Sequence, residues 1–222
     1  GWAALSFAER ALILNRAGAL LVERAEAIGA LGSQEMGKPL GECQGEAKYA
    51  AGLFATDLEE MREAYADVVT ENKRVRTTVV RDPHGVAVCI APWNFPILMP
   101  HTQVLPALAA GNAVLFKPSE RAPLTGQAYA DALLEVLPEG VMQVVHGAGD
   151  QGKALVEADV DLVVFTGSRA AGVHILNQAG KDLKRVILEL GGKDPMIVLD
   201  GANLDKAAVF AARNSFGNAG QV

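Results

Sequence analysis

The stretch VAVCIAP, residues 86–92, begins the pattern that decides the fold. It is a short apolar run that ends in a turn, and similar runs recur as far as residue 200, with helical patterns between most of them. Because these runs are short and apolar throughout, they predict parallel strands that are buried on both faces. The predicted fold is α/β, with a doubly wound parallel sheet. The later runs are NAVLFKP (112–118), VMQVVHG (141–147), DLVVFTG (161–167), RVILELG (185–191) and PMIVLD (195–200).

Two long helices are predicted before the sheet. Ser6 and Glu9 have the spacing of a capping box, in which each side chain bonds to the other residue's backbone amide. The helix that begins there is expected to end at the breakers Gly37 and Pro39. A second helical pattern runs from about residue 42 to residue 66.

The spacing of apolar and polar side chains changes after the second helix. Residues 70–82, TENKRVRTTVVRD, alternate basic with β-branched side chains, which predicts an exposed antiparallel strand. Lys73, Arg74 and Arg76 are interpreted as the solvated face of that strand. They are not interpreted as a binding patch.

The composition limits the class of function. Half of the 222 residues are hydrophobic and the net charge is −6, so nothing in the charge favours nucleic acid or an anionic membrane as a partner. No apolar run reaches the roughly 20 residues that span a bilayer, and a cytoplasmic protein is expected. Cys43 and Cys89 lack disulfide or metal spacing, and both are expected to be inert thiols. The histidines also lack metal-ligand spacing, so no metal is expected.

Parallel α/β sheets bind ligands beyond the carboxyl ends of their strands, so the residues that follow each run are candidates for a site. After the first run, Asn94 stands between Pro92-Trp93 and Phe95-Pro96, and the prolines restrict the backbone around it. A rigid amide N–H at this place could stabilise an oxyanion. The alternative is a turn asparagine that caps the next helix.

After the second run, Lys117 and Glu120 place a cation and a carboxylate three residues apart, at the expected start of a helix. An ammonium that donates to sugar hydroxyls and a carboxylate that accepts from them could hold a ribose. The alternative is an exposed ion pair at the beginning of a helix.

Two further runs end in candidate site residues. The segment from Phe165 to Gly172 joins a strand to a helix through a glycine turn, where Ser168 and free amides could bind a diphosphate. Glu189 ends an apolar strand, where partial burial could suit it to act as a general base. A simple solvated glutamate is the alternative.

In this order and spacing, PWNFP, KPSE, FTGS, ELGGK and GNAGQV closely resemble the NAD(P)-dependent aldehyde dehydrogenase superfamily. EMGKP and DPHGVAVCIAPWNFP extend the resemblance over essentially the whole chain, with the pattern of the semialdehyde-oxidising branches. The resemblance implies N-terminal helices of a cofactor domain in residues 1–69, a strand-rich oligomerisation segment in 70–84 and a Rossmann-like NAD-binding core in 85–222.

The resemblance also implies roles for individual residues in catalysis and cofactor binding. Asn94 would hold the oxyanion formed when a cysteine thiolate adds to the aldehyde, and Glu189 would activate the water that hydrolyses the thioester. The cofactor is expected to be NAD in preference to NADP, because Glu120 would repel a 2′-phosphate. The expected cofactor-binding residues are Ile90, Pro92, Trp93, Lys117, Ser119, Glu120, Gly149, Phe165, Gly167, Ser168, Leu190 and Gly191.

In the family the nucleophilic cysteine follows a segment of the form G-Q-x, which here is Gly220-Gln221-Val222. The 222 residues are therefore expected to be the cofactor portion of an enzyme, inactive alone, with self-association or poor solubility where apolar surface is exposed. The full enzyme is expected to be a homodimer or homotetramer. A catalytically dead nucleotide-binding or assembly domain is the alternative. Succinate semialdehyde is the favoured substrate, with betaine aldehyde and aliphatic aldehydes left open.

Overall fold

A computed structural model covers residues 1–222 and contains two sheets and seven α-helices. The elements in chain order are η1 (Trp2–Ala4), α1 (Phe7–Met36), α2 (Leu40–Tyr65), β1 (Val68–Glu71), β2 (Arg76–Val79), β3 (Val86–Ile90), α3 (Leu98–Ala109), β4 (Ala113–Lys117), α4 (Pro123–Leu134), β5 (Met142–Val144), α5 (Gly149–Glu157), β6 (Leu162–Gly167), α6 (Arg169–Ala179), β7 (Arg185–Leu190), α7 (Leu204–Phe216) and η2 (Gly217–Gly220).

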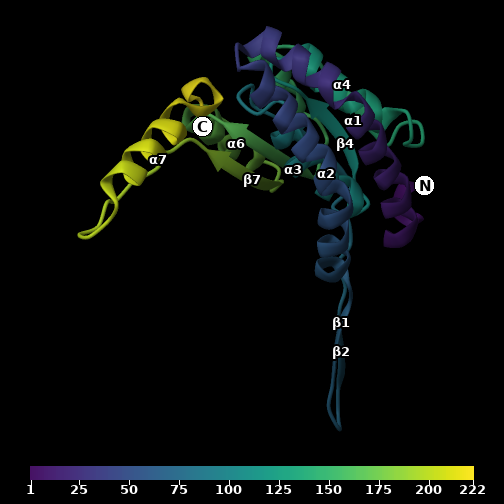
Figure 1. Ribbon diagram of the computed structural model, residues 1–222. Helices are drawn as coiled ribbons and strands as arrows, with labels where there is room; N and C mark the ends of the chain where they lie inside the picture. Colours follow the sequence, from purple (N-terminus) through teal and green to yellow (C-terminus); the bar gives the residue numbers. More distant parts are fainter.

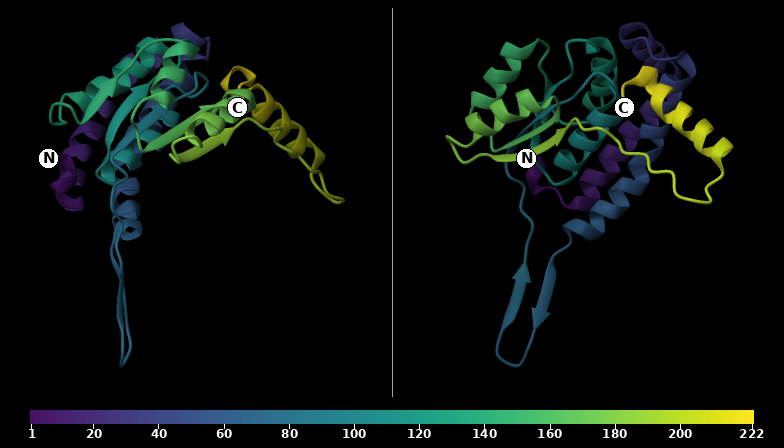
Figure 2. Two further views of the ribbon diagram at one scale, coloured as in Figure 1. Left: turned by 180° about the vertical axis from the view of Figure 1, so that it is seen from behind. Right: turned by 90° about the vertical axis from the view of Figure 1, so that its left-hand side faces the viewer.

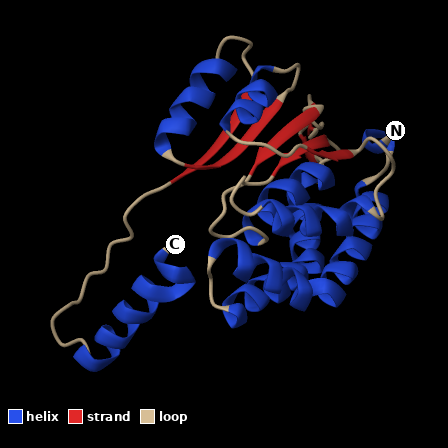
Figure 3. Cartoon of the chain, turned by 90° about the horizontal axis from the view of Figure 1, so that it is seen from above, coloured by secondary structure: helices blue, strands red, loops and turns tan.

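The main sheet is five-stranded and entirely parallel, with the order β5-β4-β3-β6-β7. Helices lie on both of its faces (Figure 3). Buried side chains of α1 to α4, such as Phe54, Leu105 and Tyr129, form the larger core on one face. Val156 of α5 and Ile175 of α6 pack on the other face. The doubly wound α/β fold predicted from the apolar runs is confirmed.

The two long N-terminal helices also match the sequence pattern. Ser6 caps α1, with a 3.3 Å bond from the Glu9 amide to its hydroxyl, and the Glu9 carboxylate accepts from the Ser6 backbone N–H at 2.7 Å. The helix ends at Gly37, whose φ of 77° is a left-handed conformation that glycine adopts without strain. The α1–α2 pair then packs against α3 and α4.

Residues 70–82 do not form one strand, so that prediction is corrected. β1 and β2 form an antiparallel hairpin, with Glu71 opposite Arg76, and it projects away from the body (Figure 1). The Asn72 side chain accepts from the backbone N–H groups of Arg74 and Val75 at 2.9 and 3.0 Å, which stabilises a turn. A local turn of this kind is not visible in a pattern of alternating polarity.

The last two predicted strands differ from the expectation. β7 is the edge of the sheet and is mostly exposed, so it is not buried on both faces. The run 195–200 forms no strand, and Ile197 and Leu199 are 80% and 73% exposed. The physical reason is that a strand needs a partner edge, and this run pairs with no other strand of the chain. α7 follows it and stands apart from the sheet (Figure 2), with no buried residue.

Candidate functional site: a cleft at the carboxyl ends of the strands

A cleft of about 470 Å³ opens where β3, β4 and β6 end and where α5 and α6 begin. Parallel α/β sheets bind ligands in the crevice outside the carboxyl ends of their strands, and this cleft lies there. Most of the cofactor-binding residues expected from the sequence line this cleft: Ile90, Pro92, Trp93, Lys117, Ser119, Glu120, Gly149, Phe165, Gly167 and Ser168. Leu190 and Gly191 do not line it, and Leu190 lies against α6 close to Gly172.

Lys117 ends β4 and is 3% exposed, so its ammonium lies at the floor of the cleft. Its Nζ donates to the Pro118 carbonyl at 3.2 Å and lies 3.8 Å from the Glu120 carboxylate. Burial lowers the pKa of Lys117, and the nearby Glu120 opposes that shift. Lys117 is the last residue of β4 and Glu120 lies on the loop that precedes α4, which begins only at Pro123, so the expected position of the pair at a helix start is corrected.

The amino-terminal ends of two helices meet the cleft. Gly149 is the first residue of α5, and Ser168 caps α6, accepting at 3.3 Å from the Ala171 amide. Free amides and the helix dipoles give this wall a partial positive charge that suits a diphosphate. A Cβ at Gly167 would lie 2.5 Å from the Phe165 ring, so a larger residue there would have to displace that ring.

Among the lining residues that the sequence reasoning missed, three are titratable. The Arg121 guanidinium lies 5.5 Å from the centre of the Trp93 ring, and Lys153 projects from α5. His174 of α6 has a buried Nε2 without a hydrogen-bond partner. Arg121 directly follows the KPSE motif, and helical spacing from Ala171 could have placed His174 on the cleft side of its helix. The Lys153 position depends on how α5 is oriented and had no local signal.

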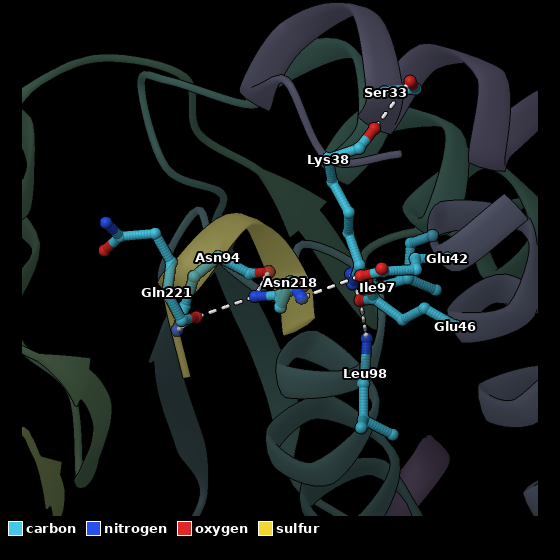
Figure 4. Close-up of polar contacts among 9 residues, drawn as sticks. All are labelled: Ser33, Lys38, Glu42, Glu46, Asn94, Ile97, Leu98, Asn218 and Gln221. Carbon is cyan, nitrogen blue, oxygen red and sulfur yellow. Dashed lines mark hydrogen bonds and ion pairs between the residues drawn. The ribbon is translucent and has the colours of Figure 1, made fainter. Parts of the chain in front are cut away.

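Asn94 lies outside this cleft, on the segment between β3 and α3. Its Nδ2 donates to the Gln221 carbonyl at 2.9 Å, which joins it to the last residues of the chain (Figure 4). An asparagine amide carries two N–H groups, so a second donor is left for another acceptor. The side chain does not cap α3, because the first helical turn is held by Glu46, whose carboxylate accepts from the amides of Ile97 and Leu98 at 2.9 Å each.

Glu189 lies on β7 beside Thr166 of β6, and its side chain is exposed. The partial burial expected at the end of a buried strand is therefore absent in this chain. The cause is the edge position of β7, because no further strand and little helix surface cover it.

Neither cysteine is placed for nucleophilic chemistry. Cys43 and Cys89 are both fully buried, in α2 and β3. Burial raises the pKa of Cys43 to about 11 and that of Cys89 to about 12. A buried thiol with a raised pKa holds little thiolate at neutral pH, which agrees with the expectation that both are inert.

No group of three or more His, Cys, Asp or Glu side chains in the chain is arranged to hold a metal ion. None of its helices combines the length and the apolar character needed to cross a membrane.

The family model described as "Aldehyde dehydrogenase family" matches residues 1–222, the whole chain. The chain belongs to the aldehyde dehydrogenase family. It is 40% identical over 224 aligned residues to the succinate-semialdehyde dehydrogenase [NADP(+)] GabD of Escherichia coli, covering 99% of this chain and 46% of that protein. It is 41% identical to the mitochondrial succinate-semialdehyde dehydrogenase of Arabidopsis thaliana, covering 99% of this chain and 42% of that protein.

A solved structure agrees with these sequence relationships. The NAD-dependent aldehyde dehydrogenase from Sinorhizobium meliloti superposes with a TM-score of 0.94 at 37% identity, covering all of this chain and 45% of that one. The chain thus spans less than half of the length of these relatives. The resemblance and the cofactor-domain fold expected from the motifs are confirmed.

Proposed function

We propose that the protein containing these residues oxidises an aldehyde to a carboxylic acid with a nicotinamide dinucleotide as oxidant. The observation that carries the proposal is the cleft, which joins a buried Lys117, a nearby Glu120 and two helix amino-termini at the carboxyl edge of the sheet. These groups fit the hydroxyls of a ribose and the charge of a diphosphate. When bound, the cofactor would supply a hydride acceptor.

In the proposed reaction a thiolate adds to the aldehyde carbon, and the carbonyl oxygen becomes an oxyanion. The free N–H of Asn94 would donate to that oxyanion. After loss of hydride, Glu189 would take a proton from the water that cleaves the thioester, which releases the acid and the thiolate. Since Cys43 and Cys89 are buried, the nucleophile is proposed to be the cysteine that the resemblance places directly after Val222.

The proposed cofactor is NAD in preference to NADP. The Glu120 carboxylate lies beside Lys117, where it would accept from ribose hydroxyls and repel a 2′-phosphate. Relatives of both kinds exist, since the E. coli protein is named for NADP(+) and the S. meliloti protein as NAD-dependent. Arg121 and Lys153 line the same cleft and would partly offset the repulsion.

The proposed substrate class is a semialdehyde, with succinate semialdehyde favoured. The support is the EMGKP pattern and the names of the two curated relatives, both of which are succinate-semialdehyde dehydrogenases. Betaine aldehyde and simple aliphatic aldehydes are the competing substrates. We further propose a cytoplasmic homodimer or homotetramer that assembles through the β1–β2 hairpin, whose strands are exposed along their whole length.

The proposal is tested on the gene product that contains residues 1–222, by following NADH or NADPH at 340 nm with a panel of these aldehydes. Reduction with at least one aldehyde is expected. Its absence with every aldehyde, together with nucleotide binding, would support the alternative of a catalytically dead binding domain.

Two variants separate the proposed steps. Asn94→Ala should slow the initial burst of NADH by roughly 10²- to 10³-fold, the effect of one oxyanion donor. Glu189→Gln should leave the burst intact and slow the turnover that follows it, because hydride transfer precedes attack by water. Glu157→Gln, an exposed carboxylate at the far end of α5, serves as the matched control and should leave both phases unchanged.

A further inference from the structure

Asn218 bridges two segments that are far apart in the sequence. Its Nδ2 donates to the carbonyl of Asn94 at 2.9 Å and to the carbonyl of Gln221 at 2.7 Å (Figure 4). The Gln221 carbonyl also accepts from the Asn94 side chain at 2.9 Å. The three residues therefore form a closed set of hydrogen bonds, here called the Asn218 bridge, that holds both the backbone and the side-chain amide of Asn94.

The bridge is built into the fold. Asn218 is 5% exposed, although α7, which precedes it, has no buried residue. Its φ of 54° and ψ of 36° lie in the left-handed region, which asparagine adopts more readily than most other residues. Burial of a polar group is costly unless it is hydrogen-bonded. The two bonds to carbonyls satisfy the Nδ2 donors of Asn218, while its buried Oδ1 has no hydrogen-bond partner in the chain.

Helix α2 anchors both sides of the bridge. Glu42 accepts from the Asn218 backbone N–H at 2.7 Å, and Glu46 accepts from the two amides that begin α3. Glu42 and Glu46 are four residues apart, so they lie on one face of the helix. The Glu46 carboxylate is itself held by the buried Lys38 at 2.6 Å. One rigid helix thus fixes the segment that carries Asn94 and the segment that carries Asn218.

We infer that Asn218 is a positioning residue for Asn94, a role that rests on the proposed function of Asn94 as the oxyanion donor. The Gln221 carbonyl takes one N–H of the Asn94 amide and so fixes its plane, which leaves the other N–H in one direction. Asn218 holds both ends of that arrangement. A donor that is oriented before the reaction stabilises developing charge without reorganisation, and a displacement of about 1 Å is enough to slow a reaction severely.

The test compares the NADH burst of the gene product with that of variants at Asn218. Asn218→Gly removes the bridge without straining the left-handed backbone. Asn218→Asp keeps the shape but turns a carboxylate towards two carbonyl oxygens. Both variants should lower the burst rate about tenfold or more, and both should leave the Kd for NAD within about twofold. Asn177→Ala, an exposed asparagine on α6, is the control and should keep a normal burst.

The double variant decides between positioning and general stability. If Asn218 acts through Asn94, adding Asn218→Gly to Asn94→Ala should cause no further loss, because the donor that it orients is already gone. A burst within about twofold of the wild type in both Asn218 variants would overturn the inference. So would a further tenfold loss in the double variant. A normal burst in Asn94→Ala alone would overturn the proposed function of Asn94, and this inference with it.

Discussion

The cofactor cleft and the segment after β7 differ in what surrounds them. The cleft is framed by strands with helices packed on both faces, and Lys117 at its floor is 3% exposed. From residue 191 to the end of α7, by contrast, every side chain is exposed or only half-buried, including large apolar ones such as Phe210 and Phe216. The chain therefore forms the cleft proposed for the cofactor with its own contacts, while much of the apolar surface beyond β7 has no partner within these residues.

The two regions should differ most in how much a substitution lowers the free energy of unfolding. Phe116 is fully buried in β4, and Phe116→Ala should lower the free energy of unfolding by about 3–5 kcal/mol. Phe210 on α7 is 59% exposed, and Phe210→Ala should change it by no more than about 0.5 kcal/mol. Urea denaturation of the 222-residue chain measures both. Equal losses would show that the C-terminal segment is packed as tightly as the core.

Thiol labelling tests whether Cys43 and Cys89 are buried in the packed region. The raised pKa of Cys43, about 11, reduces its thiolate at pH 8 about a hundredfold relative to an ordinary thiol, and burial restricts access further. Both cysteines should therefore react at least about a hundredfold more slowly with a disulfide reagent in the folded chain than in urea. Rapid labelling of the folded chain would contradict the burial of both thiols.

The same shifts have a consequence at alkaline pH. The folded chain holds the thiol protons of Cys43 and Cys89 more tightly than the unfolded chain does, because burial raises both pKa values. The free energy of unfolding therefore contains a contribution from the two protonated thiols. It is complete below the pKa of an unfolded thiol, about 9, and is lost as the pH rises towards 11. Urea midpoints measured from pH 8 to pH 11 should fall over this window, and less so in Cys43→Ala. A midpoint that stays constant would contradict the shift.

A smaller effect concerns the choice of cofactor. Glu120→Ser removes the charge that would meet a 2′-phosphate, so the preference for NAD over NADP should narrow by roughly tenfold, about 1.4 kcal/mol. Binding titrations of the gene product with both cofactors give this ratio. Glu157→Ser changes an exposed glutamate at the C-terminal end of α5 that does not line the cleft, and it should leave the ratio unchanged. Tighter binding of NADP by the unaltered protein would refute the preference.

The sequence predicted the parts of the structure that depend on local chemistry. The capping box at Ser6, the glycine end of α1 and the apolar runs located most of the helices and strands. The ends of those strands located half of the residues that line the cleft. Where a segment's structure depends on which other segments pack beside it, the predictions from the sequence were wrong. The apolar run 195–200 has strand character without a strand to pair with, and Glu189 is exposed because β7 is an edge.

The candidate site likewise contains residues that the sequence could predict and contacts that it could not. Lys117, Glu120 and Ser168 stand at strand ends, where a rule about parallel sheets applies to any such sequence. The contact between Asn94 and Asn218 joins residues that are 124 positions apart, and it forms because Glu42 and Glu46 of α2 hold both segments. No periodicity or spacing in the sequence encodes such a contact. It required the folded arrangement of three elements.

A titration of the 222-residue chain with NAD, by calorimetry or by fluorescence, tests most directly whether the cleft binds the cofactor. We expect weak but saturable binding. Lys117→Met should weaken it by about tenfold, since a hydrogen bond from a charged donor to the ribose is lost. Lys73→Met, which removes an exposed lysine from the hairpin turn, should have no effect. Binding that is absent, or that is equally strong in the Lys117 and Lys73 variants, would contradict the claim that this cleft holds the cofactor.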